Sequence, residues 1–151
     1  MTHSPIRRLL PNWRWENVDQ LAYKATGSAP FRDITRQLLF AEETLACELR
    51  YFEIGPGGHS TLERHEHAHG VMVLNGRGTC LVGRSIQPIR PHDLVTIPPW
   101  TWHQFRADDD APLGFLCMVN HERDRPVLPT PQDLAELRAD PAIADYLRIG
   151  D

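Results

Sequence analysis

A seven-residue stretch of the sequence concentrates side chains that can bind a divalent metal ion. Between Glu63 and His69 there are three imidazoles and two carboxylates, which supply the nitrogen and oxygen donors that Mn²⁺, Fe²⁺, Ni²⁺ and Zn²⁺ accept in proteins. In an unbroken strand the two ends of this stretch would lie about 20 Å apart, at ~3.3 Å per residue. One ion cannot bridge that distance, so either an adjacent i, i+2 pair binds the ion or the chain bends and brings a later residue back.

We favour a bend at residues 66–68. It would leave Glu63 and His65 side by side, return His69 to the same ion and direct His67 away from it. A further imidazole lies downstream, at the end of another predicted strand. The predicted metal ligands are therefore Glu63, His65, His69 and His103, and the predicted cofactor is one divalent ion, Mn²⁺, Fe²⁺ or Ni²⁺, with Zn²⁺ possible.

The elements that position these residues are predicted to be short β-strands. Thirteen prolines and ten glycines indicate many turns rather than long helices. The segment Gly55-Pro56-Gly57-Gly58 is expected to end a strand, and Asn75-Gly76 is expected to form a hairpin. Thr130-Pro131 predicts the start of a short helix to about residue 139, with another after Pro141. Strands are predicted over 32–39, 45–54, 71–74, 77–83, 85–90, 93–98, 102–107 and 113–120.

Composition narrows the class of protein. The 151 residues suit one compact domain, and a net charge of −4 argues against a nucleic-acid binder, which usually presents a basic face. We find no apolar run long enough for a signal peptide or a membrane span, so we expect a cytoplasmic protein. The three widely spaced cysteines, Cys47, Cys80 and Cys117, are expected to be buried thiols in a reducing compartment.

Two motifs resemble those of the cupin superfamily. The first family motif reads Gly, five residues, His-x-His, three or four residues, Glu, six residues, Gly. Anchored on Gly57 and Gly76, its marked positions fall on Glu63, His65 and His69. The first His and the Glu of the motif are exchanged here, so the set of three imidazoles and one carboxylate is kept.

The second cupin motif is matched in part. Pro98 and His103 agree with it, whereas His92, Trp100 and Ala107 stand where the family has Gly, Gly and Asn. The resemblance implies an all-β fold, a double-stranded β-helix (cupin or jelly-roll barrel) with the metal inside and a tendency to form homodimers. We therefore predict a single cupin domain over residues 1–151, with a barrel core at about 32–120, an N-terminal extension at 1–31 and a helical tail at 130–151.

Three segments are similar to small cupins that act as 1-methylthio-xylulose 5-phosphate sulfo-lyases: residues 61–67, residues 31–37 and the tail from Leu134 to Leu147. The resemblance implies a carbon–sulfur lyase that releases methanethiol and yields deoxyxylulose 5-phosphate, in sulfur salvage linked to isoprenoid precursors. A metal acting as a Lewis acid would stabilise an enediolate of the substrate. The residues expected to take part are the candidate bases His67 and Glu66, the candidate thiol Cys117, and Arg32, Arg36, Arg50 or Arg64 as phosphate ligands.

Other interpretations of the same residues stay open. An iron-dependent dioxygenase acting on a small aromatic or thiol substrate would use the same ligands, and a cupin that only binds a sugar or another small ligand would need no catalysis. A histidine-rich surface turn without function is the simplest alternative. Outside the predicted ligand set, His59, His92 and His121 are expected to be surface or structural residues, and Trp100 and Trp102 are expected to pack in the core or at its rim, although one of the two could form the floor of a substrate pocket.

Overall fold

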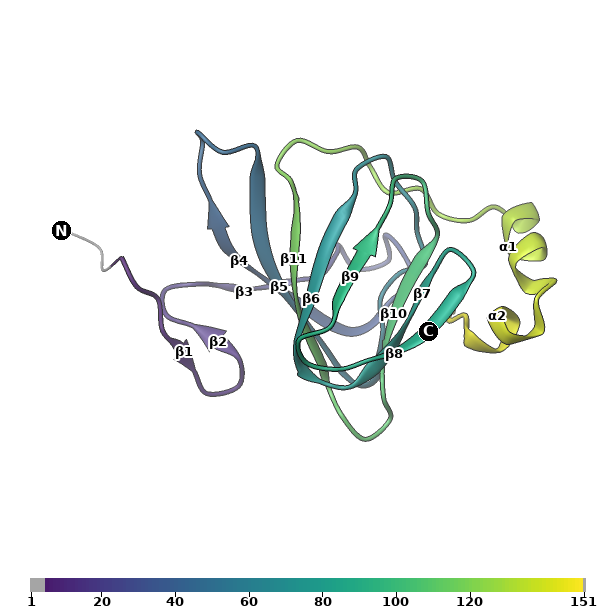
Figure 1. Cartoon of the computed structure of the whole chain (residues 1–151), viewed down its shortest axis with the longest axis horizontal. Helices are drawn as coiled ribbons and strands as arrows, with labels where there is room; N and C mark the ends of the chain where they lie inside the picture. The colour runs from purple at the N-terminus through teal and green to yellow at the C-terminus, as the bar shows by residue number, and fades with distance from the viewer. Residues whose placement is uncertain (1–4, 151) are drawn as a thin grey trace.

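The computed structural model describes residues 5–150, so the outermost parts of the predicted domain, residues 1–4 and 151, lie outside the described residues. Over the described part the chain forms eleven strands followed by two short helices (Figure 1). The strands are β1 (Leu9–Leu10), β2 (Arg14–Trp15), β3 (Gln20–Ala22), β4 (Arg32–Ala41), β5 (Cys47–His59), β6 (His69–Gly76), β7 (Gly78–Val82), β8 (Ser85–Ile89), β9 (Leu94–Ile97), β10 (His103–Ala107) and β11 (Leu113–Asn120). The helices are α1 (Pro131–Arg138) and α2 (Pro141–Tyr146).

Most strands belong to one curled antiparallel sheet. Its order is β8-β7-β10-β5-β11-β6-β9, with β4 pairing on β5 and β3 on β4. The side chains on the inner face of this curled sheet form the main core. It includes Ile54, Val73 and Leu113, none of them accessible to solvent. The predicted all-β barrel is confirmed, and burial of this apolar surface is its main source of stability.

Strand β5 connects the two sides of the barrel, and here one sequence expectation was wrong. Gly55-Pro56-Gly57-Gly58 does not end the strand, because β5 continues to His59 and pairs there with β10. Gly57 has a φ of 75°, and its N–H donates to the Asp108 carbonyl over 2.9 Å. The glycines let the strand bend from one side of the barrel to the other.

The expected hairpin at Asn75-Gly76 was also wrong. Strand β6 pairs with β9 and β11, whereas β7 pairs with β8 and β10, so the two strands that flank this turn are not neighbours. Gly76 has a φ of 74°, and a Cβ there would collide with the Pro112 carbonyl oxygen. A turn with this dipeptide therefore carries the chain across the barrel instead of back along the same sheet.

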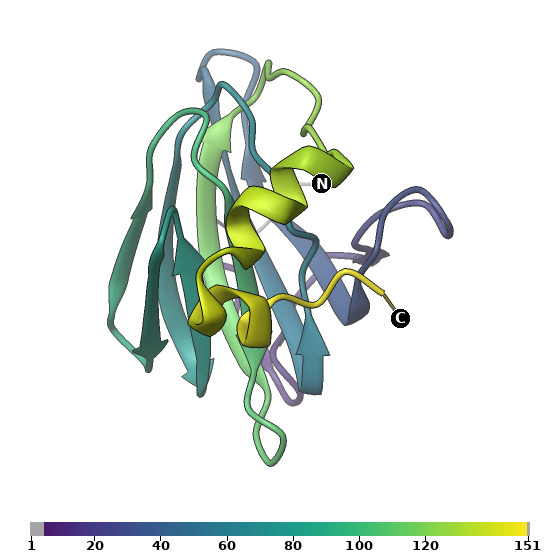
Figure 2. The same ribbon diagram turned by 90° about the vertical axis from the view of Figure 1, so that its right-hand side faces the viewer.

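The C-terminal helices cover the outside of the barrel (Figure 2). Helix α1 begins as predicted, with Thr130 and Asp133 forming a reciprocal capping box. A second apolar cluster joins the tail to the barrel and contains Leu62, Leu81, Leu137, Ile143, Tyr146 and Leu147. No helix among the described residues is long and apolar enough to cross a membrane.

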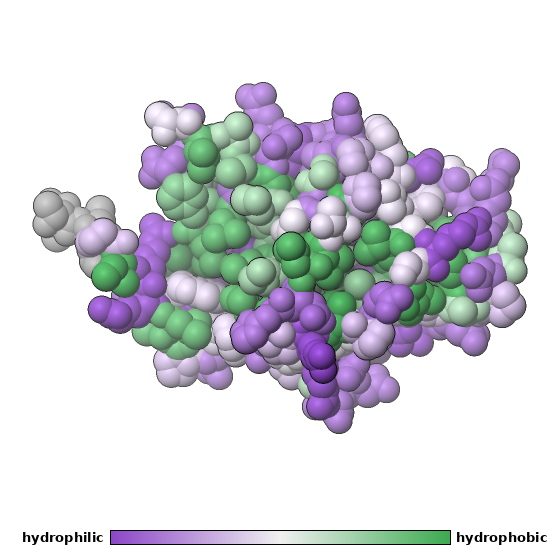
Figure 3. Space-filling view, in the orientation of Figure 1, coloured by the Kyte–Doolittle hydropathy of each residue, from purple (hydrophilic) through white to green (hydrophobic). Residues whose placement is uncertain are grey.

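The outer face of the sheet keeps a band of exposed apolar side chains (Figure 3). They lie on β4, β11, β6 and β9, and they are Leu38, Phe40, Met118, Met72 and Leu94. The short strands β1 to β3, which the sequence analysis did not predict, lie beside β4 at the same end of the molecule.

Candidate metal centre

The segment between β5 and β6 presents the histidine-rich stretch to the barrel interior. It bends at Glu66 and His67, within the predicted range of 66–68. Before the bend the segment lies against the start of β10: the Glu63 N–H donates to the His103 carbonyl over 3.3 Å, and the His103 N–H donates back over 3.1 Å. This bridge explains why residues forty positions apart share a site.

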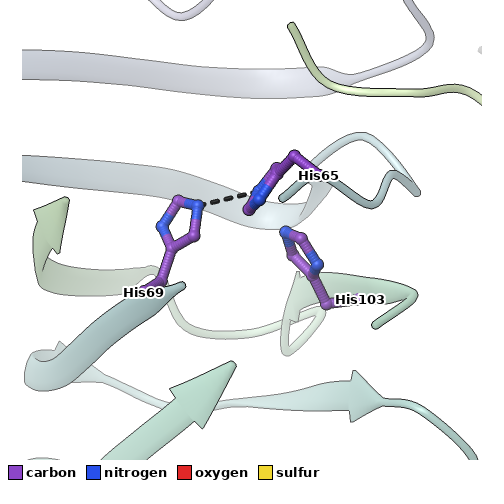
Figure 4. Close-up of side chains that lie close together, drawn as sticks. All are labelled: His65, His69 and His103. Atoms are coloured by element: carbon purple, nitrogen blue, oxygen red, sulfur yellow. Dashed lines mark hydrogen bonds between the residues drawn. The ribbon is translucent and has the colours of Figure 1, made fainter. Parts of the chain in front are cut away.

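Three imidazoles converge at this point, as Figure 4 shows. His65 comes from the bent segment, His69 begins β6 and His103 begins β10. One ligand atom from each ring lies within 4.8 Å of the other two. His65 and His103 are buried and His69 is partly buried, so the cluster lies inside the barrel.

The donor atoms of the three rings fit a metal ion. His65 Nδ1 donates to the His67 carbonyl over 2.7 Å, and His103 Nδ1 donates to the Thr101 carbonyl over 2.9 Å, so Nε2 of both rings is free of a proton when the ring is neutral. His65 Nε2 and His69 Nε2 lie 2.8 Å apart. Two nitrogens bound at right angles to one ion, each at ~2.1 Å, would be about 3.0 Å apart.

Burial keeps these imidazoles uncharged. The pKa of His65 is lowered to about 4 and that of His69 to about 2. The main cause is burial, and the second is the charge of the neighbouring His103. Burial also lowers the pKa of His103, against an opposing effect of the hydrogen bond to Thr101. Neutral imidazoles are the form that binds metals, so the site is ready to bind an ion at neutral pH.

The predicted carboxylate ligand lies beside this cluster but faces another partner. Glu63 is buried and lines the same cavity, yet its Oε2 accepts a hydrogen bond from Lys24 Nζ. Its oxygens are not part of the group that lies within 4.8 Å. The assignment of Glu63 as the fourth ligand therefore stays a prediction.

His67 is held by a residue that the sequence analysis missed. Its ring stacks on that of His65, with centroids 3.7 Å apart, and its Nδ1 lies 2.7 Å from Asp124 Oδ1. Burial alone would raise the pKa of Asp124, but hydrogen bonds from the Glu66 and His67 N–H groups and from the His67 ring lower it to about 2. The ionised carboxylate thus orients the ring at the cavity wall.

The third candidate catalytic residue, Cys117, contacts one of the three converging histidines directly. Its Sγ lies 2.9 Å from His69 Nδ1, and Arg50 Nη2 donates to it over 3.6 Å. Burial raises the pKa of the Cys117 thiol, and the Arg50 charge opposes that rise. The other two cysteines are also free thiols, with Cys80 buried and Cys47 partly exposed.

A family model described as Cupin domain matches residues 50–119. The 1-methylthio-D-xylulose 5-phosphate methylsulfurylase of Rhodospirillum rubrum is 64% identical over 143 residues, which cover 95% of this chain and 92% of that protein. The chain belongs to the cupin superfamily. The crystal structure of a cupin 2 conserved barrel domain protein from Rhodopseudomonas palustris matches this cupin with a TM-score of 0.90 and 57% identity, covering 95% of this chain and 99% of that one.

A second curated protein matches a shorter part of the chain and is named as a dioxygenase. The 5-nitrosalicylic acid 1,2-dioxygenase of a Bradyrhizobium species is 31% identical over 64 residues, which cover 42% of this cupin and 29% of that enzyme. The long, close match to the methylsulfurylase confirms the resemblance to cupins that act on 1-methylthio-xylulose 5-phosphate.

The structure brings most, but not all, of the predicted site residues together. One cavity of about 280 Å³ is lined by Glu63, His65, His67, His69, His103, Cys117, Arg36 and Arg50. Glu66 is exposed, and neither it nor Arg32 is among the lining residues. Arg64 stacks on the Trp102 ring at 4.4 Å, while Trp100 is exposed, and neither tryptophan lines this cavity.

Proposed function

We propose that this cupin breaks the carbon–sulfur bond of 1-methylthio-xylulose 5-phosphate, forming deoxyxylulose 5-phosphate and releasing methanethiol. The observation that carries the proposal is a thiol, Cys117, in contact with one of three imidazoles that converge in the barrel cavity. The close relative from Rhodospirillum rubrum, whose name contains this substrate, supports it.

The residues that would hold a divalent ion are His65, His69 and His103, with Glu63 as the proposed fourth ligand once it leaves Lys24. When bound, the ion supplies Lewis acidity toward the keto and hydroxyl oxygens of the substrate. We propose Mn²⁺, Fe²⁺ or Ni²⁺, because mixed nitrogen and oxygen ligands suit these ions.

The proposed reaction balances only if a two-electron reductant takes part. Replacing the carbon–sulfur bond by carbon–hydrogen and releasing methanethiol adds two hydrogens, and we propose that thiols supply the two electrons. Cys117 Sγ can attack the substrate sulfur and form a methyl disulfide, leaving the electron pair on C1. Two equivalents of a small-molecule thiol then reduce that disulfide, which releases methanethiol, restores Cys117 and leaves the small thiol as its own disulfide.

The contact with His69 prepares Cys117 for this attack. If Nε2 of His69 binds the ion, only Nδ1–H is left, and it must donate to Cys117 Sγ. The sulfur is then a hydrogen-bond acceptor, which favours the thiolate. The positively charged guanidinium group of Arg50 contacts the same sulfur and also favours the thiolate.

His67 is the proposed proton donor for C1. Its ring lines the cavity, and Asp124 fixes its Nδ1, so Nε2 is the atom left to exchange a proton with the substrate. Glu66, the other candidate base, is exposed and outside the lining residues, which favours His67 for this role.

An assay with the synthetic substrate tests the proposed function. Purified protein is incubated with 1-methylthio-xylulose 5-phosphate and a small thiol under argon, and deoxyxylulose 5-phosphate is followed by NMR. We expect the product to form without oxygen. When the small thiol is left out, we expect no product beyond a single turnover. A reaction that requires O₂, with oxygen in the product, would instead identify a dioxygenase, the activity for which the short Bradyrhizobium match is named.

Metal content distinguishes the proposed enzyme from a cupin that only binds a ligand. A sugar-binding or ligand-binding cupin needs no ion, so less than about half an ion per chain in protein purified without chelators would favour it.

The assembly, location and cellular role are also proposals. A homodimer is supported by the band of exposed apolar side chains on β4, β11, β6 and β9, because monomers rarely keep large apolar patches. Light scattering of the protein and of a Phe40→Glu variant tests it, with loss of the dimer expected. We further propose that the whole chain is one domain, that it is cytoplasmic and that it works in sulfur salvage.

A further inference from the structure

The end of the cavity next to Cys117 is basic. Three arginines from separate segments line it: Arg36 on β4, Arg50 on β5 and Arg123 on the loop after β11. The pKa of Arg36 is lowered mainly by burial and then by the charges of Arg50 and Arg123. This is consistent with three guanidinium groups that lie near one another. Such crowding of like charges is unfavourable unless an anion offsets it.

The protein offsets only part of this charge. Glu48 is buried and accepts from Arg123 Nη1 over 3.0 Å, and its Oε1 lies 3.9 Å from Arg50 Nε. His121, on the solvent side, contacts the same carboxylate at 3.3 Å. Three guanidinium groups against one carboxylate leave a net charge of about +2, which matches a phosphate monoester dianion.

One of the buried donors makes no hydrogen bond. The side chain of Arg50 is 11% exposed, and within the described residues its Nε makes no hydrogen bond. An unpaired donor of this kind is costly in a closed structure, unless a ligand supplies the acceptor. Guanidinium groups are also the side chains that bind phosphate oxygens best, through paired N–H donors.

We propose that Arg36, Arg50 and Arg123 bind the phosphate of the substrate, with Arg50 also in contact with Cys117. The assignment rests on the proposed function for the identity of the substrate. It adds Arg123, which the sequence analysis did not single out, and it excludes Arg32 and Arg64, which do not line the cavity. Lys24 is at the other end of the cavity and already pairs with Glu63.

The arrangement gives the substrate a fixed direction. Arg50 Nη2 contacts Cys117 Sγ, and Cys117 contacts His69, so the basic group is separated from the imidazoles by one side chain. A five-carbon chain held by its phosphate at one end therefore places its keto and sulfur-bearing carbons at the imidazoles and the thiol. Selectivity for phosphorylated over free sugars follows from the same contacts.

Direct binding tests the proposal without relying on turnover. The metal-loaded protein is titrated calorimetrically with xylulose 5-phosphate and with xylulose. We expect Arg36→Gln and Arg123→Gln each to weaken binding of the phosphorylated sugar by about 10–100-fold, the usual effect of losing a charge-assisted hydrogen bond. Binding of xylulose should not change. Arg90→Gln is the matched control, because Arg90 is exposed and outside the cavity.

The outcomes separate this proposal from the proposed function. Unchanged affinity in both arginine variants, with melting curves that show folded protein, overturns the phosphate assignment. Loss of phosphate-dependent binding in His69→Ala, without loss in the arginine variants, overturns it too, because the phosphate would then bind at the imidazoles. If the arginine variants weaken binding while the methylthio substrate is not turned over by the unmodified protein, the phosphate assignment stands and the proposed reaction fails.

Discussion

The two ends of the cavity carry different basic side chains, with neutral imidazoles at one end and charged guanidinium groups at the other. At one end His65, His69 and His103 are packed together with lowered pKa values, so they carry no charge at neutral pH. At the other end Arg36, Arg50 and Arg123 cannot lose their protons and are partly neutralised by Glu48.

On the proposed function, this difference explains how one small barrel would bind both a cation and an anion. Imidazoles lose their charge on burial and then offer lone pairs, so they can be clustered without a counter-ion and still attract a metal. Guanidinium groups keep their charge and offer only N–H donors, so a cluster of them needs an anion. Variants at one end should therefore leave the ligand of the other end in place.

The largest effect is expected at the imidazole end. His65→Ala or His103→Ala removes one nitrogen donor, and we expect metal affinity to fall by about 100-fold or more, with turnover lost as well. Elemental analysis of the purified variants measures it. His92→Ala is the control, because that imidazole is exposed and outside the cavity.

The same variants sharpen the comparison between the two ends. Chelated His65→Ala protein should still bind inorganic phosphate as tightly as chelated unmodified protein. Full metal retention by His65→Ala would refute the proposed ligand set.

The next largest effect is expected between the two ends, at Cys117. Cys117→Ala keeps the imidazoles and the arginines but removes the proposed nucleophile, so we expect turnover to fall by about 1000-fold or more with metal content unchanged. Cys80→Ala, at a buried thiol outside the cavity lining, is the control. Turnover by Cys117→Ala within tenfold of the unmodified rate would exclude a covalent role for this thiol.

The sequence predicted the imidazole end better than the arginine end, for a physical reason. Ligands for one ion must be near neighbours, so the spacing within residues 63–69 already required a bend. Arg123 and Asp124 follow the last barrel strand in a mostly exposed loop, and nothing in their local pattern indicates that the loop folds back over the cavity. Only the tertiary structure shows that these two residues lie at the cavity.

The errors in the predicted fold have a similar origin. The sequence predicted a strand end at Gly55 to Gly58 and a hairpin at Asn75-Gly76, and the structure has positive φ values at Gly57 and Gly76 but neither of these features. Which strand lies next to the turn depends on long-range pairing, and local turn chemistry does not contain it. An Asn-Gly pair, which usually closes a hairpin, therefore serves here to cross the barrel.

A smaller effect is expected at the His67–Asp124 pair. His67→Ala removes the proposed proton donor, and we expect it to keep the metal and lower turnover by about 100-fold. Asp124→Asn keeps the shape but loses the charge that orients the ring, so a loss of about tenfold is expected. Steady-state rates and metal content measure both, with Asp110→Asn as a surface control. Loss of metal from His67→Ala would make His67 a ligand instead.

The smallest effect is on stability, and it follows from the lowered pKa of His65. In chelated protein the folded state holds this imidazole at a pKa of about 4, against about 6.5 in the unfolded chain. The unfolded state therefore binds more protons below pH 6.5, so the contribution of His65 to stability is present above that pH and is lost as the pH falls toward 4.

His65→Gln removes this proton uptake, so its melting temperature should fall less between pH 6.5 and 5.5 than that of the unmodified protein. We expect a difference of about 2–4 °C, since one group contributes on the order of 1 kcal/mol over that interval. Calorimetry of chelated samples measures it, and His92→Gln should follow the unmodified protein. Equal pH slopes for His65→Gln and the unmodified protein would mean that burial does not keep His65 neutral, and the contrast between the two ends of the cavity would then lose its physical basis.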